Sequence, residues 1–270
     1  MVAIVIPLYK KKPSQEELAS LWQCKNLLCK FPIKIVCPAG MSTKEYKFLN
    51  AEVINFSGKW FRSARAYSNL LLTKEFYERF TNYHYILIYQ TDGWVFKDEL
   101  ALWCEQGYDY IGAPWLEKFE KADDNSDFVG LVGNGGMSLR NVKKHIKLFE
   151  DPYMIQTWDE ILEENKKHKK ISNILNLPVN AYRYATQYII PFSQRTKLNE
   201  DFFIAKYAQK IVPDFRFPTP EVASKFSIEC CPRKLYKLNG NKLPFLCHAF
   251  KKYDFDFWKN YINLDNRYAL

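Results

Sequence analysis

The stretch YILIYQTDG, residues 85–93, places five consecutive apolar or aromatic residues directly before a polar turn. A run that is apolar at every position is typical of a strand covered by helices on both faces. In open α/β sheets, ligands bind beyond the carboxyl ends of such strands. We therefore expect residues 85–89 to form a central strand, and Gln90, Thr91 and Asp92 to face a ligand.

Other apolar runs and helical patterns surround this strand in alternation. Residues 3–6 and 33–37 are short apolar runs that end at proline, and residues 53–56 form a third. Residues 63–80 read as one helix, because Ser63 is suited to cap it and apolar residues recur at helical spacing. This alternation predicts an α/β domain with a mostly parallel sheet. Further helices are expected at residues 142–149, 158–167 and 201–209, and a late strand or loop at residues 243–250.

The composition fits a globular protein with a basic surface. Of the 270 residues, 47% are hydrophobic and 17% aromatic, so the chain is able to bury a core without disulfide bonds. The formal net charge of +9 favours anionic partners such as nucleotides, nucleic acid or a membrane face. The cluster Lys166–Lys170, which precedes Ile171, Ile174 and Leu175, reads either as an amphipathic membrane-surface stretch or as a solvated helix face.

The sequence indicates a cytoplasmic location. Met1 leads directly into an apolar run, without the basic leader and small-residue cleavage site of a secretory signal. No apolar run approaches the roughly 20 residues that cross a bilayer. The seven cysteines show no metal-ligand spacing, so we expect reduced thiols.

Asp92 is the first candidate functional residue. A carboxylate at a strand end can clamp a divalent cation against phosphate oxygens, and Gly93 beside it allows a ligand to approach closely. The alternative is an Asp-Gly turn that only closes the strand.

The segment GNGGMSLR, residues 133–140, contains three glycines within four positions. Such a backbone can approach a ligand closely or adopt positive φ angles, so Asn134, Gly135 and Gly136 are candidates for ligand contacts. The alternative is a tight turn that leads into a strand. A phosphate-binding loop is excluded, because no Gly-Lys-Ser/Thr ending follows.

Two adjacent carboxylates, Glu200 and Asp201, open an apolar helical pattern. Asn199 is suited to cap this helix, and acidic residues in a first turn favour the helix dipole, which alone would explain both residues. The functional interpretation makes one of them a general base that removes a proton from a hydroxyl group. The two interpretations are compatible, because a capped helix end is a rigid support for a base.

His248 lies in the late segment LCHAF, residues 246–250. A neutral imidazole can complete the coordination of a cation held by Asp92, although a lone histidine is often a packing residue. Trp94 and Trp115 lie close in sequence to these motifs, so we also consider them as stacking platforms for a ligand ring.

In chain order, these segments resemble a known family. The order is IVIPLY at residues 4–9, a helix with Arg65 and Asn69, ILIYQTDGW at residues 86–94, YDYIGAPW at residues 108–115, and then GNGGMSLR, NEDFF and CHAF. This set resembles poorly characterised bacterial proteins allied to GT-A glycosyltransferases, often associated with capsule or lipopolysaccharide assembly. The similarity runs from about residue 3 to residue 250. It implies a GT-A-like α/β fold: a single domain with a Rossmann-like, mixed, mostly parallel sheet flanked by helices.

The resemblance also implies how one domain over residues 1–270 divides its work. Residues 1–115 would be the nucleotide-binding half, with Asp92 matching the last acid of an Asp-x-Asp metal motif. The residues implied to contact the nucleotide or its diphosphate are Pro7, Leu8, Tyr9, Arg65, Asn69, Gln90, Thr91 and Asp92.

Residues 116–270 would be the acceptor and catalytic half. Here the resemblance implies that Asp201 is the base of an inverting reaction, with Glu200 as the reserve candidate. His248 would join Asp92 as a ligand of Mn²⁺ or Mg²⁺. The residues expected beside the donor sugar or the acceptor are Trp94, Trp115, Asn134, Gly135 and Gly136.

One position departs from the family pattern. Gln90 occupies the place of the first acid of Asp-x-Asp, and an amide brings hydrogen bonds but no charge. A cation would then depend on Asp92, on the diphosphate and on His248.

These inferences predict transfer of a hexose from a nucleoside diphosphate, UDP rather than GDP, to a hydroxyl of a glycan or glycolipid in surface polysaccharide assembly. A lipid-linked acceptor would bring the protein to the inner face of the cytoplasmic membrane, whereas nucleic acid is not expected as a partner. Two alternatives stay open: a sugar nucleotidyltransferase of related fold, and a non-enzymatic protein that binds nucleic acid or another anionic ligand.

Overall fold

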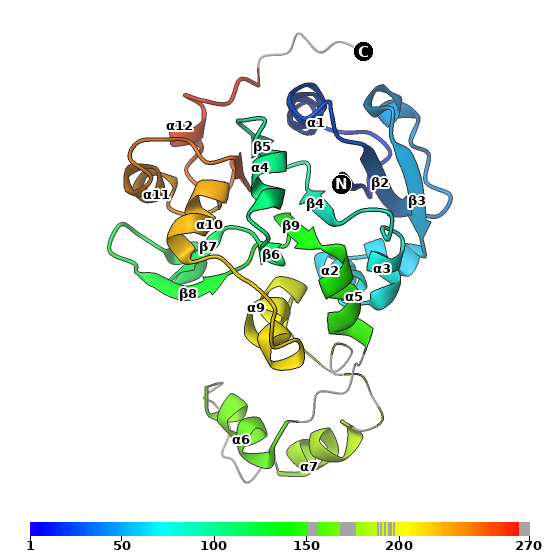
Figure 1. The fold of residues 1–270 in the computed structure, drawn as a ribbon, viewed down its shortest axis with the longest axis vertical. Helices are drawn as coiled ribbons and strands as arrows, with labels where there is room; N and C mark the ends of the chain where they lie inside the picture. Colours follow the sequence, from blue (N-terminus) through cyan, green and yellow to red (C-terminus); the bar gives the residue numbers. More distant parts are fainter. Residues whose placement is uncertain are drawn as a thin grey trace.

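A six-stranded sheet with the order β3-β2-β1-β4-β9-β6 forms the centre of the molecule (Figure 1). The computed structural model describes residues 1–150, 156–167, 177–187 and 198–264, together with positions 189, 191, 193 and 196. The strands are β1 Val2–Pro7, β2 Ile33–Pro38, β3 Glu52–Phe56, β4 Tyr85–Tyr89, β6 Tyr110–Ile111 and β9 Met137–Asn141. β1 is parallel to β2 and β4, β2 is parallel to β3, and β9 is antiparallel to both β4 and β6. The mixed, mostly parallel α/β sheet flanked by helices is thus confirmed.

Alternate side chains of the sheet enter two separate cores. Ile86 and Ile88 of β4 point to the core that packs against α2 Ala64–Leu71, α3 Lys74–Glu78, α5 Val142–Glu150 and α9 Glu200–Ile211. Leu87 and Tyr89 point to the other face, which is covered by α1 Gln15–Leu27, α4 Leu100–Glu105 and α10 Pro220–Phe226. Since neighbouring side chains of a strand face opposite sides, both faces of β4 are buried, as its continuous apolar run predicts.

The strand order reverses between β1 and β4. The chain runs from β1 outward to β2 and β3 and then returns to place β4 on the other side of β1. The crevice beyond the carboxyl ends at such a switch point is the usual ligand site of an open α/β sheet. Pro7 closes β1 and Gln90 follows β4, so the two strand ends meet at this crevice.

A small second sheet brings three further strand ends to the same region. It has the order β10-β11-β5, with β10 Ser227–Ile228 parallel to β11 Leu246–Cys247, and β5 Trp94–Val95 antiparallel to β11. Glu229 and His248 directly follow two parallel strands, and Asp92 lies just before the antiparallel one. The topology therefore gathers these three side chains at one edge.

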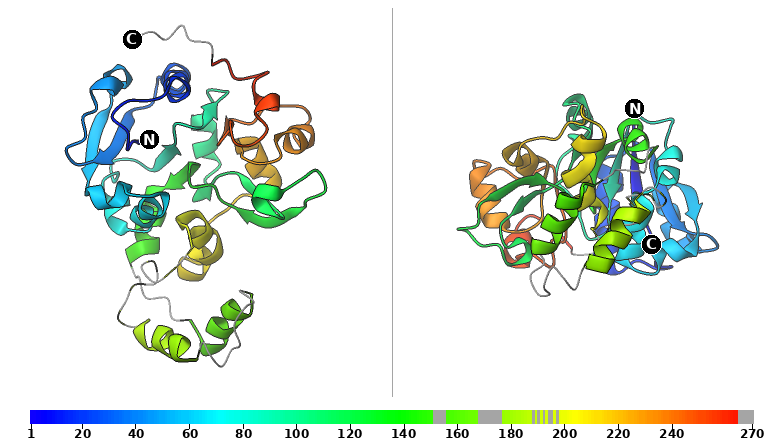
Figure 2. Two further views of the ribbon diagram at one scale, coloured as in Figure 1. Left: turned by 180° about the vertical axis from the view of Figure 1, so that it is seen from behind. Right: turned by 90° about the horizontal axis from the view of Figure 1, so that it is seen from below.

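The remaining elements lie around this frame. A hairpin of β7 Pro114–Leu116 and β8 Phe128–Val132 extends beside α10 and α11, and α6 and α7 form a pair beyond α9 (Figures 1 and 2). The other elements are η1 Lys44–Leu49, η2 Gly58–Phe61, η3 Phe119–Lys121, α6 Trp158–Lys167, α7 Leu177–Thr186, α11 Pro232–Leu238 and α12 Phe255–Trp258.

One expectation about the elements needs correction. The single helix expected at residues 63–80 is two helices, because the hydroxyl of Thr73 accepts a hydrogen bond from the Phe76 amide and starts α3 anew. The late strand or loop expected at residues 243–250 is confirmed, as a loop that contains the two-residue strand β11. The helices expected at residues 142–149, 158–167 and 201–209 are confirmed as α5, α6 and α9.

Other sequence expectations meet the structure only in part. The side chains of the cluster Lys166–Lys170 and of Ile171, Ile174 and Leu175 lie outside the described residues. Within the described part of the chain, no helix is long and apolar enough to cross a membrane. The seven cysteines are free thiols, as expected. The expected halves share one sheet, because β9 comes from the second half and pairs with β4 of the first.

Candidate functional site

His248 is the centre of a polar cluster at the crevice. Its Nε2 atom lies 3.3 Å from Gln90 Oε1 and 3.3 Å from Asp92 Oδ1. On the other side of the ring, Nδ1 lies 3.0 Å from Glu229 Oε1. The side chain of Asp92 is 56% exposed, whereas those of His248 and Glu229 are largely buried. The cluster therefore opens to solvent on the Asp92 side.

The two carboxylates hold a proton on the imidazole. Burial opposes the charge on His248, but hydrogen bonds to Asp92 and Glu229 outweigh it and raise its pKa to about 10. Burial likewise opposes ionisation of Asp92, yet the hydrogen bond and charge of His248 lower the pKa of that carboxyl. In the ligand-free protein at neutral pH, the pair is thus an imidazolium and a carboxylate.

The same atoms fit the ligand shell of a divalent cation. Neighbouring ligands of an octahedral cation with bonds of about 2.1 Å lie about 3 Å apart, close to the separations around Nε2. Glu229 on Nδ1 supplies the carboxylate that commonly orients a metal-bound histidine. In the described ranges, no three His, Cys, Asp or Glu side chains gather to form a metal site. A cation here would therefore need Asp92, His248, the neutral amide of Gln90 and oxygens of a bound ligand.

Asp201 lies at the amino end of α9 and faces the glycine turn. Its Oδ2 atom accepts a hydrogen bond of 3.2 Å from the Gly135 amide, and its Oδ1 atom accepts one of 2.8 Å from the Phe202 amide. Burial and the neighbouring charge of Glu200 raise its pKa to about 7, despite these two bonds. A carboxylate with this pKa is suited to accept a proton near neutral pH.

Glu200 has a structural role instead of the reserve catalytic role that we expected. Its side chain is 6% exposed, and Oε1 pairs with Nη2 of the fully buried Arg140 at 3.1 Å. Arg140 also donates to the Gly135 carbonyl, the Ser138 hydroxyl and the Tyr77 hydroxyl. A carboxylate that is buried and paired in this way has no free approach to a substrate, so the structure offers Asp201 for the base.

Gly135 and Gly136 connect the two parts of the site. Gly135 contacts Asp201 through its amide, and a Cβ atom on it would lie 2.0 Å from Glu200 Oε1. A Cβ atom on the next residue, Gly136, would lie 2.2 Å from His248 Nε2. The absence of side chains at these two positions therefore lets Glu200 and His248 approach the same short turn, which Asp201 contacts through the Gly135 amide.

Asn134 shapes this turn from within. It is buried at 2% exposure and has a positive φ of 73°. Its side-chain oxygen accepts hydrogen bonds from the amides of Gly136 and Met137. We expected Asn134 to contact a ligand, but the structure gives its oxygen to the backbone.

Four of the expected nucleotide residues line one small cavity at the end of β1. Pro7, Leu8, Tyr9 and Thr91 surround it together with Lys10, Glu17 and Tyr46. Tyr9 is 64% exposed, so its ring is available to stack on a base. Lys10 forms an ion pair of 2.8 Å with Glu17, which also accepts a hydrogen bond from Thr91.

The expected residues on α2 lie elsewhere. Arg65 donates to the Thr196 carbonyl at 2.6 Å and to Asn199 Oδ1 at 3.4 Å, so it holds the chain that leads into α9. Asn69 lies one turn further along the same helix. The structure places Arg65 at the Asp201 side of the site, away from the cavity at Pro7.

Trp94 and Trp115 are core residues, contrary to the expectation that they stack on a sugar. Trp94 is 4% exposed and packs edge-on against Phe250. Trp115 is 2% exposed and stacks on Phe202 with ring centroids 3.9 Å apart. Both rings therefore pack against other side chains. Trp115 also packs against the start of the glycine turn, since a Cβ atom on Gly133 would lie 2.0 Å from its ring.

Two important residues were missed by the sequence analysis. Glu229 follows a strand of only two residues and has no motif around it, so its place beside His248 emerges only from the pairing of β10 and β11. Arg140 ends the glycine-rich segment of residues 133–140, and the sequence alone assigned it no role. A strand position with Arg among apolar neighbours is a signal for a buried, fully paired charge.

Comparison with solved structures finds distant similarity to glycosyltransferases over most of the chain. Mouse xyloside xylosyltransferase 1 in its apo form is 12% identical, with a TM-score of 0.47, and the match covers 92% of this chain and 97% of that one. The galactosyltransferase LgtC in complex with donor and acceptor sugar analogues is 13% identical, with a TM-score of 0.46 and coverage of 92% and 86%. A glycosyltransferase involved in glycosylation of the major capsid of PBCV-1 is 9% identical, with a TM-score of 0.41 and coverage of 91% and 92%. At these scores the function must be argued from the residues of this chain.

Comparison of sequences gives one match. No curated protein matches the chain. A family model described as a protein of unknown function matches residues 50–248, a range that spans β4, the glycine turn, Asp201 and His248. By this match the chain belongs to the DUF5672 family.

Proposed function

We propose that this protein is a glycosyltransferase that moves a hexose from a nucleoside diphosphate, preferably UDP, to a hydroxyl group of a glycan or glycolipid acceptor. The observation that carries the proposal is the turn at Gly135 and Gly136. One of these glycines binds the candidate base Asp201 and the other lies against His248. A candidate proton acceptor and a charged cluster thus contact the same short turn.

The reaction is a single displacement with inversion. The Asp201 carboxylate takes the proton of the acceptor hydroxyl as its oxygen forms a bond to C1 of the donor hexose. The bond between C1 and the phosphate oxygen breaks, and the electron pair leaves with the nucleoside diphosphate. The pKa of about 7 leaves Asp201 substantially ionised at neutral pH, so it is ready to receive that proton.

Mn²⁺ or Mg²⁺ is the cofactor that we propose for the His248 cluster. Asp92 and His248 would hold it, with the Gln90 amide beside them, and when bound it would neutralise the charge that develops on the diphosphate. Glu229 keeps the His248 ring in place by its contact with Nδ1. Because His248 carries a proton in the free protein, cation binding must release that proton, and affinity should rise with pH.

A thermal-shift screen with nucleoside diphosphates, with and without Mn²⁺ or Mg²⁺, tests this function. We expect UDP with a cation to raise the melting temperature more than either component alone, because a ligand that binds only the folded state stabilises it by mass action. The donor is then identified by incubating the protein with different UDP-sugars and measuring the UDP that hydrolysis releases.

The variant Asp92→Asn tests the cation site. Its matched control is Asp127→Asn, at an exposed position on the β7–β8 hairpin. Asp92→Asn should lose the cation-dependent part of the shift, and Asp127→Asn should keep it. If no nucleoside diphosphate stabilises the wild-type protein under any cation condition, the proposed function is wrong.

A further inference from the structure

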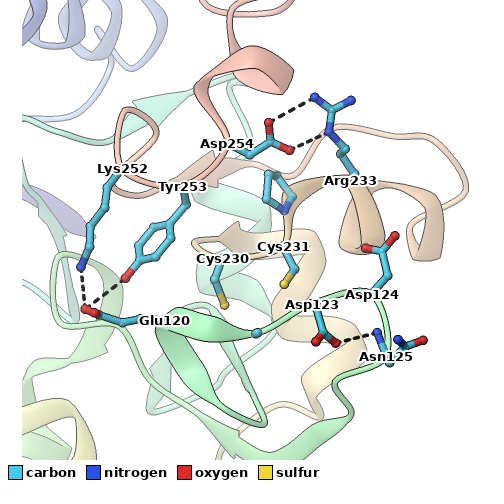
Figure 3. Close-up of a pocket in the computed structure, with 12 residues that line it drawn as sticks. Glu120, Asp123, Asp124, Asn125, Cys230, Cys231, Arg233, Lys252, Tyr253 and Asp254 are labelled. Atoms are coloured by element: carbon cyan, nitrogen blue, oxygen red, sulfur yellow. Dashed lines mark hydrogen bonds and ion pairs between the residues drawn. The ribbon is translucent and has the colours of Figure 1, made fainter.

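A cavity of about 590 Å³ lies beside the site and takes no part in the functions assigned above. Its wall is formed by the loop at residues 120–125, by the segment Cys230–Arg233 and by residues 252–254 (Figure 3). In Figure 3 the side chains of Cys230, Cys231 and Asp123 project between these segments. A volume in this range is typical of pockets that hold a small organic ligand such as one or two sugar rings.

Two chain connections place this cavity next to the reaction centre. Cys230 in its wall directly follows Glu229, whose carboxylate contacts His248. On the other side, Glu120 follows Phe119, whose ring lies 6.2 Å from that of Phe202, the residue after Asp201. The cavity is therefore one residue away from the His248 cluster on one side and one ring contact away from the base on the other.

The charges of the wall disfavour an anion. Four carboxylates line the cavity, whereas Arg233 and Lys252 are its two cations. Both cations are paired within the wall, Arg233 with Asp254 at 2.6 Å and Lys252 with Glu120 at 2.5 Å, and Asp123 is paired with Lys118 at 3.0 Å. With both of its cations already paired, the wall offers little attraction to a phosphate or a uronic acid, and its carboxylates are acceptors for the hydroxyl hydrogens of a neutral ligand.

The wall also contains groups that suit a sugar ring. Asp124 and Asn125 are exposed on the loop that forms one side, and Tyr253 presents a half-buried ring on another. Carboxylate and amide oxygens accept bonds from hydroxyl groups, and an aromatic ring can pack against the apolar face of a sugar.

We propose that this cavity binds the acceptor of the transfer reaction, and that the acceptor end is a neutral, hydroxyl-rich sugar. This proposal rests on the proposed function and extends it to the acceptor class. The nucleotide end of the donor has a separate place at Pro7 and Tyr9, beside the basic Lys10. The donor nucleotide and the acceptor would thus occupy two cavities that share no residues.

Cys231 provides a direct test of occupancy that does not depend on catalysis. It is a half-buried free thiol in the cavity wall. Cys29, in the loop between α1 and β2, is an exposed free thiol that serves as the reference. The whole protein would be labelled with N-ethylmaleimide at mildly alkaline pH, and the rates at both thiols followed by peptide mass spectrometry. The probes are glucose, galactose, mannose, xylose and lactose, with glucuronate and galacturonate as the charged comparison.

We expect at least one neutral sugar to slow labelling of Cys231 about threefold when its concentration is twice its dissociation constant, because the free fraction is then one third. Cys29 should react at an unchanged rate, and the uronates should give no protection. Protection by a uronate and not by the neutral sugars would overturn the assignment of a neutral acceptor.

A pair of variants connects occupancy to transfer. Asp124→Ala should remove the protection of Cys231 and raise KM for the protecting sugar, with the UDP-dependent thermal shift and hydrolysis of the donor unchanged. Asp256→Ala, at an exposed position outside the cavity, should leave all these readouts unchanged.

The outcomes separate this inference from the function on which it rests. Normal nucleotide binding and donor hydrolysis, with no protection of Cys231 by any probe and no effect of Asp124→Ala on transfer, would refute the acceptor site alone. Absence of nucleotide binding in the wild-type protein would refute the proposed function, whatever the labelling shows.

Discussion

A carboxyl group that is held partly out of water binds its proton more tightly than the same group in an unfolded chain. Asp201 is such a group, with its pKa raised from 3.8 to about 7 by burial and by the charge of Glu200. The proposed role as a base needs the ionised form, because only that form accepts a proton. Folding favours the protonated form, so activity and stability make opposite demands on this residue.

The variant Asp201→Asn should therefore lose activity and gain stability. Loss of the base should lower the transfer rate about 100-fold or more, with UDP binding retained. Between about pH 4 and pH 7 the unfolded wild-type chain binds fewer protons at this position than the folded one, so wild-type stability falls as pH rises. The urea midpoint of Asp201→Asn should exceed that of the wild type at about pH 8 and match it at about pH 4.

Activity of the wild type gives the complementary measurement. The rate of transfer should rise with pH through about 7 and then level off, following ionisation of Asp201. Normal turnover by Asp201→Asn would remove this residue from the mechanism, whereas equal urea midpoints at both pH values would show that its pKa is not raised on folding.

Gly136→Ala is the second prediction at the scale of one residue. The added Cβ atom would lie 2.2 Å from His248 Nε2 and 2.7 Å from Gln90 Oε1, so the imidazole must move. We expect the cation-dependent part of the UDP thermal shift to disappear. Gly58→Ala is the matched control, because nothing lies within 4 Å of its Cβ position and its φ is ordinary. A normal Mn²⁺ response in Gly136→Ala would show that the cation does not use His248.

Single residues also show what the sequence can and cannot predict. Asp92, Asp201 and His248 could be named because each lies in a local pattern that limits its place: a strand end, a helix start or a late polar position. Trp94 and Trp115 lie just as near these patterns, but nearness in sequence does not fix which way a ring points, and both are buried. Glu229 could not be found, since its position depends on which distant segments pair.

At the scale of elements, strand β9 organises the site. It is antiparallel to its neighbours, so its amino end begins at the crevice where the parallel strands β1 and β4 end. This direction places the turn at Gly135 beside Gln90, whose backbone N–H donates a hydrogen bond to the Gly136 carbonyl. The sequence predicted the turn, but only the antiparallel direction explains why it faces the same crevice as Asp92.

Arg140 on β9 carries a prediction about stability. Its guanidinium is fully buried and binds Glu200, Gly135, Ser138 and Tyr77. Arg140→Met leaves the Glu200 carboxylate buried without its partner, which should cost about 3–5 kcal/mol of unfolding free energy. Urea unfolding measures this loss. The double variant Arg140→Met with Glu200→Gln should recover part of it, because the unpaired charge is then gone.

The elements also show where periodicity misleads. Residues 63–80 keep a helical apolar spacing across two helices, because both pack on the same core. The break at Thr73 comes from one hydroxyl that starts a new helix, and a window of apolar residues does not register it. The two-residue strands β5, β10 and β11 are too short to give any period, although they position Asp92, Glu229 and His248.

At the scale of the whole molecule, both expected halves contribute to one sheet. β9 at residues 137–141 lies between β4 and β6 of the first half, and α9 packs on the same core as α2. Removing residues 116–270 would expose one edge of β4 and would take α5 and α9 from one face of the sheet and α10 from the other. The chain should therefore fold as one cooperative unit.

Urea unfolding followed by tryptophan fluorescence and by far-ultraviolet circular dichroism tests this expectation. The two signals should give coincident transitions for the full chain. The separate fragments of residues 1–115 and 116–270 should lack cooperative unfolding, because neither completes the sheet. Two separated transitions in the full chain, or a stably folded fragment 1–115, would contradict a shared domain.

The two adjacent glycines have a further consequence for how this protein could diversify. A single peptide unit sets the spacing between Asp201, the proposed proton acceptor, and His248, the proposed cation ligand. Neither can be retuned by itself, because any shift of one moves the other. Relatives that act on different sugars are then expected to keep this spacing and to differ in the loops around it.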